Sequence, residues 1–254
     1  MNADQNQPWN SRAWRSELPP GRAAVTAFID ALRRRLRDFE SRASLPQELE
    51  QAVRQVIAGD DLPARFTQAA ASVGLQVHPA SPVDWMSVIG DILRKHEAHS
   101  VVVQLDTDSP LGKRATDDLG NRLTADGFAP TTAVDDETLF SADAAVTSVA
   151  AAIAETGSVV CPSGPGLARG ASLLPPVHVA IVHASELVPD LCDYFDGLSA
   201  AVGNSPLGPA SSSSTSLPAN INLITGPSKT ADIEGILVTG VHGPRHVHVV
   251  LVSP

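Results

Sequence analysis

The sequence contains very little cysteine, no long hydrophobic run and few positive charges. Cys161 and Cys192 are the only two cysteines among 254 residues, too few for a disulfide framework or for ligating an iron–sulfur cluster alone. Every apolar run is far shorter than a bilayer span, and the N-terminus has no apolar signal-peptide core. We therefore expect a cytoplasmic protein that does not insert into a membrane.

Acidic residues outnumber basic ones. The chain has 28 Asp and Glu against 18 Lys and Arg, which gives a net charge of −10 at pH 7. Since phosphate contacts require a basic face, we do not expect nucleic-acid binding. After residue 122 the only cations are Arg169, Lys229 and Arg245, each in a Gly/Pro/Ser-rich loop. These loops either converge into a positive site for an anion or reflect the common placement of Lys and Arg in loops.

Helical patterns alternate with short apolar runs along most of the chain. Apolar spacing and capping residues predict helices at 25–42, 46–58, 62–73, 81–96, 113–125 and 187–200. Apolar runs predict buried strands at 75–78, 101–105, 177–182, 222–225 and 246–252. The small apolar residues from 144 onward predict closely packed strands with a hinge at Thr156-Gly157. The alternation favours an α/β fold with a mainly parallel sheet.

Composition also predicts how the chain is organised. Residues 1–20 are polar and end in a Pro-Pro-Gly turn, which is typical of a flexible N-terminal arm. Residues 21–79 form an N-terminal helical region, and residues 80–254 form the α/β domain. The segment 205–218 is rich in Ser, Pro and Gly, so we expect a mobile surface loop there.

The stretch from Ile224 to Val252 is the richest in turn-forming and polar residues. Its pattern predicts a strand, a tight turn, a helix capped by a hydroxyl residue, a Gly-rich loop and a final strand. Free N–H groups at such a helix end bind anions, although acids in the first turn can also merely complement the helix dipole. The ligand-binding candidates here are Thr225, Gly226, Ser228, Lys229, Thr230, Asp232, Glu234, Gly243 and Arg245.

Three other residues are candidates for chemistry. Glu155 lies in an otherwise apolar segment, so its carboxylate is a general base, nucleophile or ligand clamp, or else binds a nearby backbone turn. His242 stands between Val241 and Gly243 in a Gly-rich loop and either acts as an acid or base or caps backbone carbonyls. His178 begins a buried strand and is either a ligand-binding residue or a core histidine.

Metal and thiol chemistry receive weaker support. His246 and His248 share one face of the last strand, but no third ligand has a clear spacing, so we predict no metal site. Cys161 follows a buried strand, where a small buried residue is a better interpretation than a nucleophile.

Three segments resemble the LUD-domain family, in particular its LutC-like branch. They are Ala154-Glu155-Thr156-Gly157, the stretch LPPVHVA at 174–180, and GPSKTADIEGILVTGVHGP at 226–244. The resemblance covers roughly residues 80–254. It implies a three-layer fold like that of the NagB/RpiA/CoA-transferase group, with a mainly parallel sheet. It also implies a role in the oxidation of L-lactate to pyruvate.

The resemblance implies iron–sulfur proteins as partners, and no cofactor in this chain. On this hypothesis the chain is a non-redox subunit that binds a small carboxylate or phosphorylated ligand, with Arg169 and His178 among the contacts. Two alternatives remain open. One is a separate acyl-transfer or isomerase enzyme using Glu155, by analogy of fold, and the other is a module that senses a small anion. A homo-oligomer is compatible with each.

Overall fold

The computed structural model describes residues 27–32, 34, 54–106, 109–111, 114–164, 166–202, 218–231 and 237–253. The chain divides into two compact units, Met1–Val53 and Arg54–Pro254, and the account below concerns the second. In the first unit, residues 27–32 and 34 are helical, within the helix predicted for 25–42. The predicted arm at 1–20 and nearly all of the predicted loop at 205–218 lie outside the described residues.

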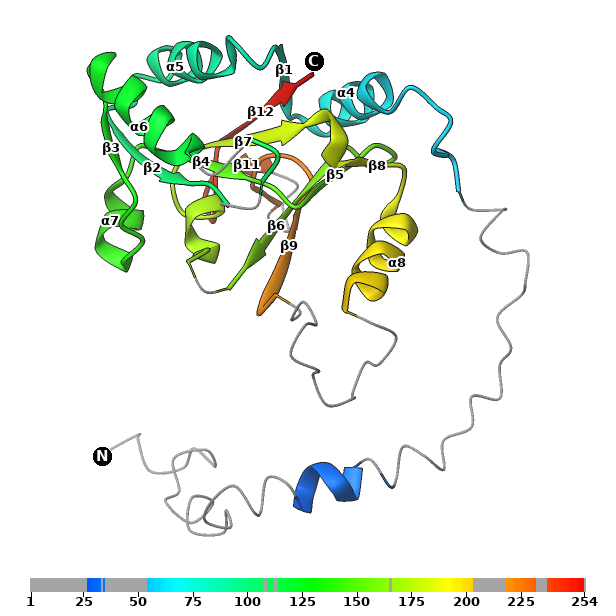
Figure 1. Cartoon of the computed structure of the whole chain (residues 1–254). Helices are drawn as coiled ribbons and strands as arrows, with labels where there is room; N and C mark the ends of the chain where they lie inside the picture. Colours follow the sequence, from blue (N-terminus) through cyan, green and yellow to red (C-terminus); the bar gives the residue numbers. More distant parts are fainter. Residues whose placement is uncertain are drawn as a thin grey trace, which may run out of the picture. The chain divides into compact units, whose positions relative to one another are not determined.

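A six-stranded sheet forms the centre of the second unit (Figure 1). Its strand order is β1–β12–β7–β4–β2–β3, and every neighbouring pair is parallel. The strands are β1 Gln76–Ala80, β2 Ser100–Gln104, β3 Ala129–Thr131, β4 Ala144–Ser148, β7 Val177–His183 and β12 His246–Val252. The predicted α/β fold with a mainly parallel sheet is confirmed.

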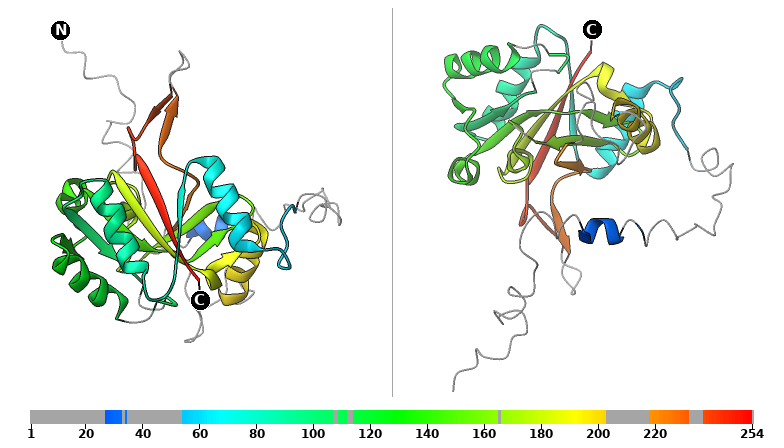
Figure 2. Two further views of the ribbon diagram at one scale, coloured as in Figure 1. Left: turned by 90° about the horizontal axis from the view of Figure 1, so that it is seen from above. Right: turned by 60° about the horizontal axis from the view of Figure 1, so that its bottom comes forward.

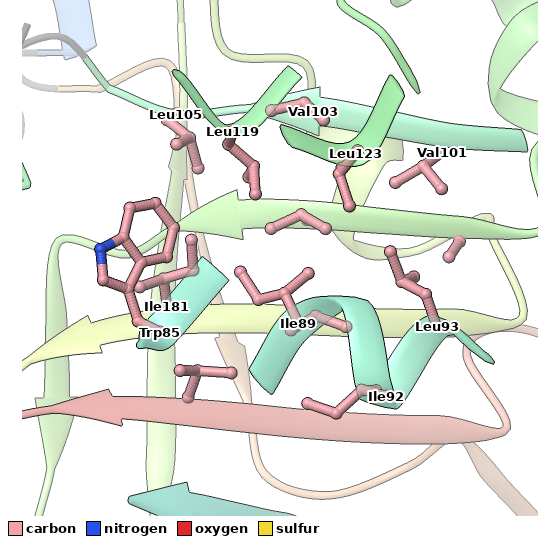
Figure 3. Close-up of a cluster of buried hydrophobic side chains, with 14 of the residues drawn as sticks. Trp85, Ile89, Ile92, Leu93, Val101, Val103, Leu105, Leu119, Leu123 and Ile181 are labelled. Carbon is pink, nitrogen blue, oxygen red and sulfur yellow. The ribbon is translucent and has the colours of Figure 1, made fainter. Parts of the chain in front are cut away.

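Helices α5 (Trp85–Lys95) and α6 (Ala115–Ala125) cover one face of this sheet. Their buried side chains recur at helical spacing and point onto the strands, as Figure 3 shows for Ile89 and Leu119. Opposite them lie alternate strand residues such as Val101 and Ile181. Because the other face is also covered, the strands are apolar throughout rather than alternating.

A smaller sheet, which the sequence did not predict as a separate layer, covers much of the other face. Its order is β8–β5–β6–β9, with β5 Ala151–Ile153, β6 Ser158–Ser163, β8 Leu187–Val188 and β9 Asn220–Ile224. Helix α4 (Leu62–Val73) packs beside it through Phe66 and Ala70, while α8 (Leu191–Val202) packs on it through Tyr194. The remaining helices are α7 Asp136–Ser141 and the 3-10 turns η1 Arg169–Ser172 and η2 Ala184–Glu186.

Two predicted helices need correction at their ends. Residues 54–58 are not helical, in contrast to the helix predicted for 46–58, whose first part lies outside the described residues. The helix predicted from residue 187 begins at Leu191, because Leu187–Val188 pairs with β5 as strand β8. Helix α4 and strand β1 belong to the same compact unit as the parallel sheet, although the sequence placed them in an N-terminal helical region.

The helix predicted after Gly226 is wrong. Strand β10 (Lys229–Ala231) instead pairs antiparallel with β11 (Leu237–Thr239), and Figure 2 shows this ribbon standing out from the domain. Thr230, Val238 and other β-branched residues favour a strand over a helix here. The expected helix terminus for an anion is therefore absent from the described part of this segment, and Asp232 and Glu234 lie outside the described residues.

Four histidines gather at the β1–β12 edge of the parallel sheet. The ring of the buried His248 has its Nδ1 3.0 Å from Nε2 of His78, and its Nε2 2.8 Å from Nε2 of His96. His246 stacks on His96 with ring centroids 4.4 Å apart. Burial, and then the charges of His78, His96 and Lys95, lower the pKa of His248 to about 3. His248 is therefore a neutral, hydrogen-bonded core residue.

The turn between β5 and β6 provides a first test. Gly157 has φ +65°, and a Cβ there would overlap the backbone of Ala69 and Ala70 in α4. We expect Gly157→Ala to destabilise the fold by about 3 kcal/mol or more, measured by urea unfolding. Gly127 has φ +90° with open space around it, so Gly127→Ala should cost only about 1 kcal/mol. Equal losses for the two variants would contradict this packing.

The neutral His248 gives the protein a defined pH dependence. In the unfolded chain His248 takes up a proton near its ordinary pKa of 6.5, whereas in the fold its pKa is about 3. The stabilisation is therefore complete above about pH 6.5 and is lost progressively as the pH falls below it. From about pH 7.5 to about pH 5, wild type should lose about 2 kcal/mol more unfolding free energy than His248→Phe.

Urea unfolding at the two pH values measures this difference. His248→Phe should also be less stable than wild type at the higher pH, because two ring contacts are lost. The exposed His242 offers a matched control, and His242→Gln should keep the wild-type decline. A decline in His248→Phe as steep as in wild type would overturn the assignment.

Candidate functional site

Strands β2 and β4 are neighbours from which the chain leaves in opposite directions. After β2 it passes through α6 to β3 on one side, and after β4 it passes through the second sheet to β7 on the other. Such a divergence leaves a crevice at the carboxyl ends of two parallel strands, which is where open α/β sheets hold ligands. A cavity of about 20 Å³ lies at this position. It has room for about one water-sized group, and not for a nucleotide.

Polar side chains from four segments line this switch-point cavity. They are Gln104 at the end of β2 and Asp106 just after it, Thr147 and Ser148 at the end of β4, Cys161 in β6, and Ser172 in η1. Since carboxyl ends of parallel strands meet at one edge of a sheet, the fold brings together residues that are far apart in the sequence.

Two hydrogen-bonded contacts fix the walls of the cavity. The Gln104 amide accepts from the Ala168 N–H at 2.8 Å and donates to the Ala168 carbonyl at 3.3 Å, which ties the loop before η1 to β2. On the other side, the Ser148 hydroxyl accepts from the Asp106 N–H at 2.7 Å. The positions of Asp106 and Ser148 relative to each other are therefore set by the β2–β4 pairing.

A buried polar cluster forms the floor. The Thr147 hydroxyl lies 2.9 Å from Nε2 of His178, which is fully buried, while the His178 Nδ1 has no hydrogen-bond partner among the described residues. Burial lowers the pKa of His178 to about 4, so this ring is neutral. Burial raises the pKa of the Cys161 thiol to about 12, although hydrogen bonding with Thr147 and Ser172 acts in the opposite direction. Cys161 is thus a thiol and a poor nucleophile.

A carboxyl group close to the cavity also has an altered pKa. Glu186, in the turn after β7, accepts from the His183 N–H at 2.7 Å. Burial, opposed by that hydrogen bond and aided by the charge of Asp106, raises the pKa of Glu186 to about 7. Proton uptake by Glu186 therefore partly reduces the negative charge that Glu186 and Asp106 place near the cavity.

Glu155 lies at the other end of β5 from the switch-point cavity. Its Oε1 accepts from the Gln55 N–H at 3.0 Å, and the neighbouring Arg54 pairs with Asp190 and Asp193 at 3.4 and 3.0 Å. Glu155 also borders a second, open cavity of about 380 Å³ together with Arg65. The partly buried carboxylate of Glu155 thus holds the segment around Gln55 against the turn after β5. A catalytic role for Glu155 stays a prediction.

The other residues predicted from the Ile224–Val252 stretch serve mainly to join elements. The hydroxyl of Thr225 lies 2.7 Å from that of Ser158 in β6, and Gly226 packs closely on the Val73 carbonyl at the end of α4. Lys229 donates to that same carbonyl at 3.3 Å.

The base of the ribbon is held by backbone contacts. The N–H of Ser228 donates to the Pro244 carbonyl at 2.9 Å, and Gly243 packs against the Ser228 side chain. The exposed predicted residues are Arg169, Thr225, Lys229, Thr230, His242 and Arg245. Ligand binding by these residues, and convergence of the three cations, stay predictions.

Sequence reasoning missed most of the cavity. Of its polar lining, only Cys161 was considered, whereas His178 was predicted as a ligand contact and lies directly behind Thr147. A usable signal was present: Gln104, Thr147 and Ser148 are polar residues that end buried apolar runs. Polar residues in that position face the crevice whenever the strands are parallel.

Within the residues that the structure describes, no group of three or more His, Cys, Asp or Glu side chains has a geometry suited to a metal ion. No helix in the described part of the chain is long and apolar enough to span a bilayer.

Comparison with known proteins places this architecture in a family. The family model of the LUD domain matches residues 63–252. Lactate utilization protein C of Bacillus subtilis is 41% identical over 101 residues, which cover 40% of this chain and 38% of that protein. The protein of the same name from Exiguobacterium sp. is 40% identical over 116 residues, 46% of either chain. The chain thus spans less than half the length of these curated relatives.

A solved structure supports the same fold. A DUF162 family protein from Deinococcus radiodurans superposes with a TM-score of 0.50 and 20% sequence identity, covering 76% of this chain and 96% of that one. At this identity the likeness concerns the fold alone. Because the family match spans most of the sequence, this chain belongs to the LUD domain family.

Proposed function

We propose that the chain takes part in lactate utilization by binding a small carboxylate such as lactate in the switch-point cavity. The observation that carries this proposal is a small polar cavity at the β2–β4 divergence of a LUD domain. The relatives named lactate utilization protein C supply the substrate class.

The polar groups of the cavity suit a ligand that enters with its carboxylate first. Thr147 and Ser148 line the cavity, and hydroxyls donate to carboxylate oxygens without adding a charge. The cavity volume of about 20 Å³ has room for about one water-sized group, such as one oxygen of a carboxylate, and not for a large cofactor. Among the described residues that line the cavity there is no Lys or Arg, so the proposed binding uses neutral donors.

Oxidation of lactate requires an electron acceptor, and we propose that partner proteins provide it. With only two cysteines, this chain does not supply the four thiolates that an iron–sulfur cluster usually needs. In this proposal the chain is the non-redox component of an assembly with iron–sulfur proteins. It either passes the carboxylate to these partners or receives it from them.

Calorimetric titration of the full chain with L-lactate tests the binding site. We expect Thr147→Val and Ser148→Ala each to weaken binding about tenfold, because each removes a hydrogen bond to a charged group. The matched control is Thr124→Val on the exposed side of α6, which should bind as wild type does. Unchanged affinity in both cavity variants, or no binding of lactate, pyruvate or acetate, would rule out this site.

Co-expression tests the assembly. The tagged full chain, produced together with the iron–sulfur proteins of the proposed assembly, should retain them through affinity and size-exclusion steps, with their visible absorbance in the same fraction. If the chain elutes alone and its deletion leaves growth on lactate unchanged, the proposed role in an assembly is wrong. The calorimetry alone would then decide whether the carboxylate site exists.

A further inference from the structure

His178 and Thr147 form a buried pair on neighbouring strands. The parallel register of β4 and β7 places Ala145 opposite His178 and Ala180 opposite Thr147. These two small residues leave room for the imidazole ring, whose Nε2 lies 2.9 Å from the Thr147 hydroxyl. Thr147 lines the switch-point cavity, whereas His178 is fully buried and is not among the residues that line it. An effect of His178 on a ligand in the cavity therefore passes through Thr147.

The surroundings of the His178 ring determine where its hydrogen lies. Burial lowers the pKa of His178 to about 4, so the ring is neutral and has a single N–H. That hydrogen lies either on Nε2, beside the Thr147 hydroxyl, or on Nδ1, which has no hydrogen-bond partner among the described residues. The contact with Thr147 is made in both tautomers, so they differ in whether a buried N–H or a lone pair is left over. A buried N–H without an acceptor is the rarer and more costly of the two, which assigns the hydrogen to Nε2.

This tautomer fixes what the Thr147 hydroxyl offers to a ligand. Because Thr147 accepts the hydrogen of Nε2, its own hydrogen points away from the ring. Within the described structure the other contact of this hydroxyl is with the Cys161 thiol, and sulfur is a weak acceptor. A carboxylate oxygen in the cavity is a stronger acceptor and takes this hydrogen. In the opposite tautomer Thr147 would donate to the ring and present only lone pairs, which repel a carboxylate.

We propose that His178 is a positioning residue, which as the Nε2–H tautomer holds Thr147 as a hydrogen-bond donor toward a ligand carboxylate. This inference rests on the proposed carboxylate site. His178 keeps its hydrogen throughout and does not touch the ligand. The arrangement favours an anion because hydrogen bonds in a chain polarise one another, so a hydroxyl that accepts from the ring donates more strongly to the ligand.

Two amide variants of different reach test this role by calorimetric titration of the full chain with L-lactate. The amide nitrogen of His178→Gln reaches the position of Nε2 and can donate to Thr147, whereas that of His178→Asn is one methylene short of it. We expect His178→Gln to bind L-lactate within about twofold of wild type and His178→Asn to bind it about fivefold more weakly. The same two changes at the exposed His99, which precedes β2 at its amino end, should leave the affinity unchanged.

A double-mutant cycle distinguishes positioning from a general loss of structure. In the Thr147→Val background, His178→Asn should weaken lactate binding no further, because the hydroxyl through which His178 acts is gone. Weakening of the same size with and without the Thr147 hydroxyl overturns the positioning role. Equal affinities of His178→Gln and His178→Asn overturn it as well.

Nitrogen NMR of the ligand-free full chain with labelled histidine determines the tautomer directly. Near neutral pH the assigned His178 ring should show a protonated Nε2 and a bare Nδ1. A protonated Nδ1 overturns the role of His178 and leaves the carboxylate site in place, since this measurement requires no ligand. Absence of binding of L-lactate, pyruvate and acetate to wild type overturns both the site and the inference. Should both His178 variants fail to fold, the tautomer and the wild-type titration still decide the question.

Discussion

The position of β4 between β2 and β7 is the constraint on which the candidate site depends. All five residues of β4 are buried, and its parallel register aligns Gln104 with Thr147 on one side and Ala180 with Thr147 on the other. That register leaves Thr147 beside the His178 ring and places the Ser148 hydroxyl on the N–H of Asp106. A shift of the strand register by one residue would turn every side chain of β4 to the other face of the sheet and eliminate the cavity.

The second sheet explains how several polar groups at this edge are largely buried. Strand β6 contributes Cys161, and the loop that follows is attached to β2 through the two hydrogen bonds of Gln104 with Ala168. Buried polar groups are tolerated because nearly all are paired with one another. The unpaired Nδ1 of His178 is the exception among them, and its lone pair is the least costly group to leave without a partner.

Periodicity predicted several helices and strands well, because buried positions recur at the spacing of a helix or as an apolar run. Helix α4 has the predicted bounds, 62–73, and β12 those of the last predicted strand. The ribbon after Gly226 was predicted as a helix because turn and capping residues precede it, although half of the residues in its two strands are β-branched. The cavity was missed for a different reason. Its residues come from four separate segments, and their proximity follows from strand order, which periodicity does not encode.

Electrostatics connects the site to the overall acidity of the chain. Burial and the nearby charge of Asp106 already raise the pKa of Glu186 to about 7, so its carboxyl group is close to half protonated at neutral pH. On the proposed function, a carboxylate bound beside Asp106 would add negative charge and raise that pKa further. Binding would then draw a proton onto Glu186, and by reciprocity protonation would favour binding. An acidic domain can accept an anion in this way, through hydroxyl donors and a carboxyl group that takes up a proton.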